Sequence, residues 1–452
     1  MSTAIIFFET NELNMPNNQN RREFLQHIGT LSVAAGTGSV LPFFTQDITA
    51  KKSFVSVKQG RVLKIFNGQV ITPYRTIKDG TIIAVDGVIT EVREGNIDVP
   101  NAEVIDAQGR YIAPGFVDLH VHGGGDHDFL DGNVHAFLKA AECHARHGTT
   151  SMYPTALSGD VDTLLENLDI YEEANRQNDF GAQFQGIFLE GPYYSMEQRG
   201  AQDPRYIRDP DPEEYKKILS HSPAIKRWDS APEREGALEF ARYLVSQGVL
   251  PSMGHTGAIY DEVLTGFENG YTLATHLYSG MLGVTRRDAY RYAGAVESAF
   301  LIDEMSVEII ADGKHLPAPL LKLIYKIKGP DRIALVTDAM RGAGMPEGNS
   351  ILGPRNDGLE VIIEDGVAKL PDRASFAGSV ATTDRLVRTM INLADVPLTE
   401  AVRMMTATPA AIMNINDKKG SLVAGKDADI VIFDDDILVE KTIINGNVIY
   451  SR

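Results

Sequence analysis

Hydrophobic and polar positions divide the chain into stretches of different texture. Residues 53–112 alternate apolar and polar positions in short runs such as VLKIFNGQVIT and GTIIAVDGVITEV, punctuated by Asn-Gly and Asp-Gly pairs. This alternation predicts β-strands joined by tight turns. The same texture returns near the end, in DADIVIFDDDILVEKTIINGNVIYSR. We therefore predict that residues 53–112 and 417–452 together build one small β-sandwich domain.

Between these ends, residues 113–416 alternate short, continuously apolar runs with amphipathic segments. The apolar runs are GFVDLHVH, TTSMYPT, FQGIFLEG, LPSMGHT, LATHLYS, SVEIIAD and RIALVTDAM. Continuously apolar strands separated by helices are typical of a parallel α/β core, and about eight such units close a TIM barrel. The predicted fold class is therefore α/β, a (β/α)8 TIM barrel with the small β-sandwich domain, and we expect a small β insertion at residues 358–372.

Residues 1–50 match neither texture. Arg21 and Arg22 precede a weakly apolar run of small residues, which is typical of a twin-arginine export signal. Gly36 and Gly38 interrupt that run, so it is too short to form a stable membrane anchor. We expect an export signal and leader on a periplasmic or otherwise exported protein; the alternative is a cytoplasmic protein with a basic tail.

Composition limits the possible partners and sites. The formal net charge of the 452 residues is -18, which disfavours nucleic acids and anionic membranes as partners. Cys143 is the single cysteine, so the chain can form neither an intramolecular disulfide nor a cysteine-based zinc cage. A small-molecule substrate is the expected partner.

Polar side chains stand at the carboxyl ends of the predicted barrel strands. In a TIM barrel these ends all face one rim, where active sites are built. A single histidine at a strand end is more commonly a hydrogen-bonding residue, but several ligand-type residues on one rim indicate a metal centre. The residues are His120, His122, Glu190, His255, His276 and Asp338.

These residue types predict metal-assisted hydrolysis. His120 and His122 lie two positions apart on one strand, so both imidazoles point the same way. Imidazole and carboxylate ligands suit zinc, iron, manganese, nickel or cobalt, with zinc the first choice and one or two ions per site. A divalent ion lowers the pKa of a bound water and polarises a carbonyl group. Asp338 would carry the proton of the attacking water to a leaving amine.

The motifs also resemble a known family. PGFVDLHVHG, FLEGPY, APE, GHT, ATHLYSGM, ADGKH, VTDAM, FAGS and GSLVAGKDADIVIFD occur in the order found in the amidohydrolase superfamily, and specifically in its N-acetylglucosamine-6-phosphate deacetylases. The resemblance covers roughly residues 53–452. It implies a TIM barrel with a β-sandwich, hydrolysis of an acetamido group to an amine and acetate, and a homodimer.

The resemblance further implies two metal positions. Glu190, His255 and His276 match the ligands of the main metal, and His120 and His122 match those of a second metal. Members that lack the H-x-H pair work with one ion, so the presence of this pair favours two.

Substrate recognition is where the sequence departs from the family. Gln202 stands where the family has a histidine, and glutamine can donate a hydrogen bond but carries no positive charge. Ser279 and Gly280 replace residues that meet the substrate's phosphate. Arg287 matches a family arginine, in a segment, RRDAYRYAGAVE, that is longer than the family's turn. His315 matches a phosphate-side residue that reaches in from the partner subunit in dimeric relatives.

The resemblance gives Asp338 the role of catalytic acid and base, and predicts the hydrolysis of N-acetylglucosamine 6-phosphate to glucosamine 6-phosphate and acetate. Two same-class alternatives are a deacetylase of an unphosphorylated N-acetylhexosamine, which an exported protein would meet more readily, and an N-acyl amino acid or dipeptide hydrolase. A noncatalytic protein of the same fold is a further alternative, but it predicts lost ligands, whereas all six are present.

Overall fold

The computed structural model describes residues 60–452. The export signal predicted for residues 1–50 lies outside the described residues. Within residues 60–452, none of the helices has both the length and the apolar character needed to cross a membrane.

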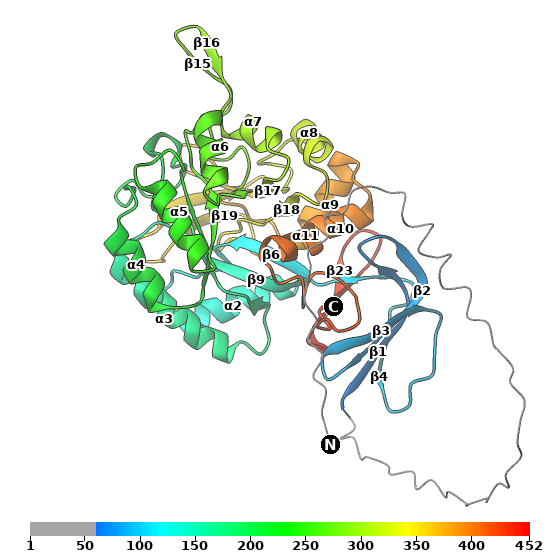
Figure 1. The fold of residues 1–452 in the computed structure, drawn as a ribbon. Coiled ribbons are helices and arrows are strands. Elements are labelled where there is room, and N and C mark those ends of the chain that lie inside the picture. Colours follow the sequence, from blue (N-terminus) through cyan, green and yellow to red (C-terminus); the bar gives the residue numbers. More distant parts are fainter. Residues whose placement is uncertain (1–59) are drawn as a thin grey trace, which may run out of the picture. The chain divides into compact units, whose positions relative to one another are not determined.

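Eight parallel strands form a nearly closed barrel (Figure 1). A parallel bridge from Val121 to Ala339 and a hydrogen bond of 2.8 Å from Asp338 N to His120 O join the last strand segment to the first. This arrangement confirms the predicted fold class. In order of pairing, the strands are β6 (Phe116–Val121), β9 (Thr149–Ala156), β11 (Ile187–Leu189), β12 (Ile225–Ser230), β13 (Leu250–Met253), β14 (Leu273–Ala274), β17 (Ser306–Ile309) and β18 (Ile333–Leu335).

A helix follows each barrel strand. Each of these amphipathic segments forms a helix that buries its apolar face. In α3, Asp160 caps the first turn by accepting a bond of 3.0 Å from Thr163 N, and Leu164, Leu168 and Tyr171 are buried at the helical spacing. The helices are α2 (Val134–Ala145), α3 (Val161–Gln177), α4 (Pro212–His221), α5 (Ala237–Ser246), α6 (Tyr260–Glu268), α7 (Ala295–Leu301), α8 (Ala318–Lys328) and α9 (Thr383–Ala394), followed by α10 (Leu398–Met405) and α11 (Ala407–Ile412).

Strands from both ends of the described chain share the small β domain. Antiparallel pairing of Val431 with Ala113 joins the late strands to the early ones, and Ile65, Ile112 and Ile430 lie in its fully buried core. The strands are β1 (Val62–Ile71), β2 (Thr76–Val85), β3 (Val88–Glu94), β4 (Glu103–Asp106), β5 (Tyr111–Pro114), β22 (Ile430–Phe433), β23 (Val439–Ile444) and β24 (Asn447–Ser451).

Several short strands lie outside these two sheets or at their edges. The β insertion expected at residues 358–372 is confirmed by a three-stranded sheet of β19 (Gly348–Leu352), β20 (Leu359–Glu364) and β21 (Val367–Lys369). A hairpin of β15 (Thr285–Arg287) and β16 (Tyr290–Tyr292) projects away from the barrel (Figure 1). The remaining strands are β7 (Gly123–Gly124), β8 (His127–Asp128) and β10 (Gln183–Phe184).

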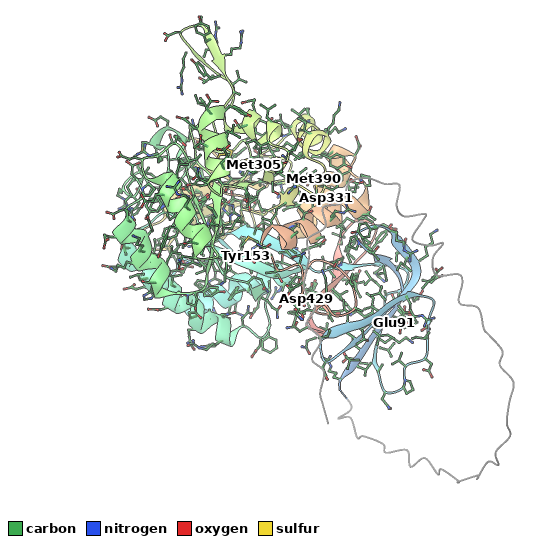
Figure 2. All side chains as sticks on the ribbon, in the orientation of Figure 1. Glu91, Tyr153, Met305, Asp331, Met390 and Asp429 are labelled. Atoms are coloured by element: carbon green, nitrogen blue, oxygen red, sulfur yellow. The ribbon has the colours of Figure 1, made fainter. Side chains whose placement is uncertain are left out.

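Apolar side chains fill the space between the barrel and its helices. Met305 and Met390 belong to the largest core cluster of the described residues, and Tyr153 lies inside the barrel (Figure 2). Val117, Leu119 and Phe188 are buried in the same interior cluster as Tyr153. These side chains support the carboxyl ends of the strands, where the polar residues lie.

Candidate active site and metal centre

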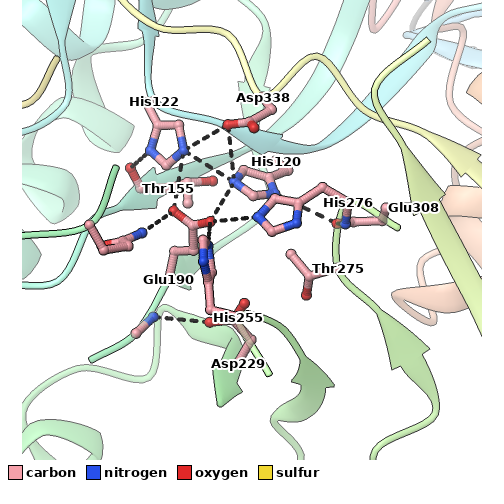
Figure 3. Close-up of polar contacts among 12 residues, drawn as sticks. His120, His122, Thr155, Glu190, Asp229, His255, Thr275, His276, Glu308 and Asp338 are labelled. Carbon is pink, nitrogen blue, oxygen red and sulfur yellow. Dashed lines mark hydrogen bonds and ion pairs between the residues drawn. The ribbon is translucent and has the colours of Figure 1, made fainter. Parts of the chain in front are cut away.

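Six ligand-type side chains from the carboxyl ends of five barrel strands, β6, β11, β13, β14 and β18, meet at one point (Figure 3). Each lies within β6 or within three residues of the end of its strand, so the parallel register of the barrel brings them together. All six are buried, with exposures from 0% for His120 to 8% for Asp338. The residues are His120, His122, Glu190, His255, His276 and Asp338.

Glu190 is at the centre of the cluster. Its Oε1 lies 3.1 Å from His276 Nε2, 3.3 Å from His255 Nε2 and 3.5 Å from His120 Nε2. Its Oε2 lies 3.5 Å from His122 Nε2. One carboxylate therefore faces the Nε2 atoms of four imidazoles.

A second group gathers around Asp338. Asp338 Oδ1 lies 3.1 Å from His122 Nε2 and 3.5 Å from His120 Nε2, and the two Nε2 atoms are 3.1 Å apart. The possible ligand atoms of His120, His122 and Asp338 lie within 4.8 Å of one another, and so do those of His120, Glu190 and His276. Imidazole nitrogens and carboxylate oxygens at these separations fit one or two divalent transition-metal ions.

The electrostatics of the cluster favour added positive charge. Burial alone would raise the pKa of Glu190, but the charge of His120 and bonds from His255 and His276 hold that pKa well below its usual range. Burial alone would lower the pKa of His120, yet the charges of Asp338 and Glu190 raise that pKa well above its ordinary value. The cluster therefore stabilises cations, which is what a site for a divalent metal requires.

The backbone around the cluster holds the side chains in place. His255 Nδ1 lies 2.9 Å from Gln198 O and His122 Nδ1 lies 3.3 Å from Thr155 O, so each ring keeps Nε2 directed at the cluster. His255, His276 and Asp338 have φ angles of 47°, 28° and 46°, a left-handed conformation that is uncommon outside glycine. Backbone strain of this kind concentrates at functional sites.

A buried ion pair beneath the cluster was not anticipated from the sequence. Arg227 on β12 and Glu308 on β17 are both fully buried, and Arg227 Nη2 donates to Glu308 Oε2 at 2.9 Å. Glu308 Oε2 lies 3.6 Å from His120 Nδ1 and accepts from His276 N at 3.4 Å. Charged residues inside the runs IKRWDS and SVEIIAD were the available signal.

A cavity of about 490 Å³ opens over the cluster. Of the substrate residues predicted from the sequence, Gln202, Ser279, Gly280 and His315 line it. His315 lines the cavity of its own chain, because the ADGKH loop follows β17 directly onto the same rim. Arg287 is not among the lining residues; it lies on exposed β15, over the ring of Tyr292.

The model of the amidohydrolase family matches residues 111–449. The chain belongs to the amidohydrolase family. It is 32% identical over 371 residues to an N-acetylglucosamine-6-phosphate deacetylase of Lysinibacillus sphaericus, covering 80% of this chain and 91% of the relative. It is 31% identical over 371 residues to an N-acetylgalactosamine-6-phosphate deacetylase of Escherichia coli O157:H7, covering 82% of this chain and 93% of the relative.

Solved structures show the same similarity in three dimensions. The N-acetyl-D-glucosamine-6-phosphate deacetylase of Mycobacterium smegmatis, as a point mutant in complex with N-acetyl-D-glucosamine-6-phosphate, superposes with a TM-score of 0.79 at 29% identity, over 87% of this chain and 100% of that one. The corresponding enzyme of Pasteurella multocida gives a TM-score of 0.80 at 26% identity, over 86% and 100%. As an amidohydrolase with these relatives, the chain is an enzyme that hydrolyses amide bonds.

In this amidohydrolase, Gln202 supports the cluster directly. Its Nε2 donates to Glu190 Oε2 at 2.8 Å, and its Oε1 accepts from Ser158 N at 3.1 Å. The side chain is buried, with an exposure of 5%. One amide N–H is thus committed to Glu190, and the other remains as a neutral donor at the cavity wall.

Proposed function

We propose that the enzyme hydrolyses the acetamido group of N-acetylglucosamine 6-phosphate, giving glucosamine 6-phosphate and acetate. The observation that carries this proposal is the convergence of four histidines, Glu190 and Asp338 beneath one cavity. Relatives with this activity cover most of the chain, which supports the substrate.

The residues fit a divalent metal at one or two positions. Glu190, His255 and His276 would hold a main ion, and His120, His122 and Asp338 a second. Zinc is the first choice for such ligands, with iron, manganese, nickel and cobalt as alternatives. A bound divalent ion lowers the pKa of water and polarises the acetyl carbonyl.

Asp338 is proposed to move the proton. Burial alone would raise its pKa, but the charge of His120 and the bond from His122 lower it, so the carboxylate is ionised and can accept a proton. As the water oxygen bonds to the acetyl carbon, its proton passes to Asp338. The same proton then passes to the substrate nitrogen as the carbon–nitrogen bond breaks, which leaves an amine and acetic acid. The acid loses the second proton of the water to give acetate.

The test is to incubate metal-loaded enzyme with N-acetylglucosamine, its 6-phosphate, N-acetylgalactosamine 6-phosphate and an N-acetyl amino acid, and to measure released acetate. We expect the highest kcat/KM with N-acetylglucosamine 6-phosphate. The galactosamine epimer is the second candidate, since similar relatives act on it. Failure to release acetate from either hexosamine 6-phosphate contradicts the proposal, whatever happens with the other two compounds.

We also propose a homodimer, supported by the resemblance to dimeric relatives, and light scattering of the purified enzyme tests it.

Export by the twin-arginine route is proposed from Arg21 and Arg22. A reporter protein fused after the leader should stay inside the cell when both arginines are replaced by lysine. Unchanged export of the reporter contradicts this route.

A further inference from the structure

One wall of the cavity carries positive charge that the proposed chemistry does not use. Lys369 and Arg373 line the cavity, and they are the only lysine and arginine among its described lining residues. Apart from the metal-cluster carboxylates Glu190 and Asp338, no acidic side chain joins that described lining. In a protein with a net charge of -18, a cationic wall of this kind indicates an anionic ligand.

The wall is tied to the metal cluster. Lys369 ends β21 and bridges to Phe376, and Leu370 N donates to Ser375 O at 3.0 Å, so the intervening turn is closed. The loop then reaches Ser379, whose N donates to Asp338 O at 2.7 Å. The turn is therefore held in place relative to the proton-transferring residue.

Arg373 occupies the turn in an unusual conformation. Its φ angle is 60°, in the left-handed region that glycine adopts without cost, and its N donates to Leu370 O at 2.8 Å. Strained backbone conformations concentrate at functional sites, so an arginine at a position suited to glycine indicates a functional role for its guanidinium group. Next to this turn, the ring of Phe376 lies 4.7 Å from the ring of His315, which extends the same wall.

The acidic partners of the two cations lie outside the cavity lining. Lys369 Nζ lies 2.8 Å from Asp365 Oδ2 and 3.2 Å from Glu364 Oε1, and Arg373 Nε lies 2.9 Å from Glu364 Oε1. The Arg373 side chain is 54% exposed, and exposed ion pairs contribute little to stability, whereas the Lys369 side chain is 17% exposed. These contacts orient the cations and leave them able to meet a stronger anion.

We propose that Lys369 and Arg373 bind the phosphate group of the substrate. A phosphate monoester is close to a dianion at neutral pH and offers several acceptor oxygens, which suits an ammonium and a guanidinium group together. This assignment rests on the proposed function. It explains how the chain recognises a phosphate with Ser279 and Gly280 in the places of family phosphate contacts and with Arg287 outside the lining of its own cavity.

The experiment compares Lys369→Gln, Arg373→Gln and the double variant with wild type, using N-acetylglucosamine 6-phosphate and N-acetylglucosamine. We expect each single variant to lower kcat/KM about tenfold more for the phosphorylated substrate than for the other, mainly through KM, because each removes a charged hydrogen bond. Lys369→Arg and Arg373→Lys keep the charge and should restore part of the loss. Lys322 is an exposed lysine that pairs with Asp395 outside the lining, so Lys322→Gln should leave kcat/KM unchanged for both substrates.

Calorimetric binding of glucosamine 6-phosphate and glucosamine gives a readout that does not need turnover. The double variant should lose affinity for the phosphorylated amine alone. Equal losses for both ligands, or no loss for either, overturn the assignment while leaving the proposed function intact. Wild type that releases no acetate from either hexosamine 6-phosphate overturns the proposed function instead, and binding of glucosamine 6-phosphate still decides the role of the two cations.

Discussion

At the scale of single residues, the site combines side chains that perform chemistry with side chains that hold them. Asp338 faces His122 and His120 at 3.1 and 3.5 Å, whereas Gln202 touches Glu190 at 2.8 Å. Both are buried, and they differ in what their replacement should change. The two cases can be separated by measuring turnover and metal binding independently.

Replacing Asp338 by asparagine should lower kcat by about 10²- to 10⁴-fold, because the amide cannot accept and return the proton. Glu190, His255 and His276 are unchanged in this variant, so elemental analysis should still find the main metal ion that they would hold. Asp331→Asn, at an exposed position, serves as the control. A variant with substantial activity rules out Asp338 as the acid and base.

Replacing Gln202 by leucine should weaken metal binding by about 10- to 100-fold, because Glu190 loses the donor that orients Oε2. A chelator competition assay measures this affinity, and exposed Gln247→Leu is the matched control. Unchanged affinity would mean that Gln202 acts on the substrate alone.

At the scale of elements, the barrel strands bring charged residues into the interior as well as onto the rim. Arg227 on β12 and Glu308 on β17 pair beneath His120. Burial alone would raise the pKa of Glu308, but the charge of Arg227 and the neighbouring imidazole of His120 lower it to about 2. Because that pKa lies below its ordinary value of 4.5, the stabilising contribution is complete above pH 4.5 and is lost as the pH falls toward 2.

Replacing Glu308 by glutamine should reduce the free energy of unfolding by roughly 3–5 kcal/mol at neutral pH, because Arg227 is left buried without its counter-charge. Chemical denaturation between pH 7 and 2 measures the free energy of unfolding of both proteins. The difference between wild type and variant should become smaller as the pH falls. Exposed Glu268→Gln is the control. If the difference in unfolding free energy does not change with pH, the ionised pair of Arg227 and Glu308 is not its cause.

The polar residues at the rim of the barrel could be predicted from the sequence, whereas the charged pair in its interior could not. His120 and His122 could be placed because strand alternation and barrel topology both act on them. The strand β12 was not among the predicted runs, since Lys226, Arg227 and Asp229 make it read as polar, and only the barrel shows that Arg227 faces Glu308. Contacts between residues distant in sequence depend on the closed sheet, which local patterns do not encode.

The same limit applies to the cavity wall. Gln202 was recognised as a departure from the family, but its bond to Glu190 depends on how the loop after β11 folds back. Lys369 and Arg373 lie in or next to a predicted β insertion, and nothing local to that segment indicates that it borders the metal cluster.

At the scale of the whole molecule, a buried lysine links the barrel sheet with the segment that leads into β22. Lys419 Nζ lies 2.6 Å from Gln183 Oε1 on β10, 2.6 Å from Asp429 Oδ2 and 2.9 Å from Asp427 Oδ2. Lys419 and Asp429 are 6% and 5% exposed. One ammonium group therefore satisfies two carboxylates and one amide between the two parts.

Replacing Lys419 by methionine should lower the free energy of unfolding by roughly 3–5 kcal/mol, because Asp429 keeps a buried charge without its partner. Thermal or chemical unfolding followed by circular dichroism measures the change. The neighbouring exposed Lys418→Met should alter stability by less than about 0.5 kcal/mol. Equal effects of the two variants would contradict the proposed link.

The shared sheet of the small domain has a consequence for the order of events during synthesis. Strands β1 to β5 leave the ribosome before the barrel strands, but β5 exposes an unpaired edge until β22 arrives, since Pro114 pairs with Ile430. The whole barrel is translated in that interval. Unpaired strand edges are templates for aggregation. A nascent chain that stalls before residue 430 has strands β1 to β5 with an unpaired edge, attached to a barrel whose strands are all synthesised. Premature termination late in translation should therefore yield aggregates in place of soluble barrels.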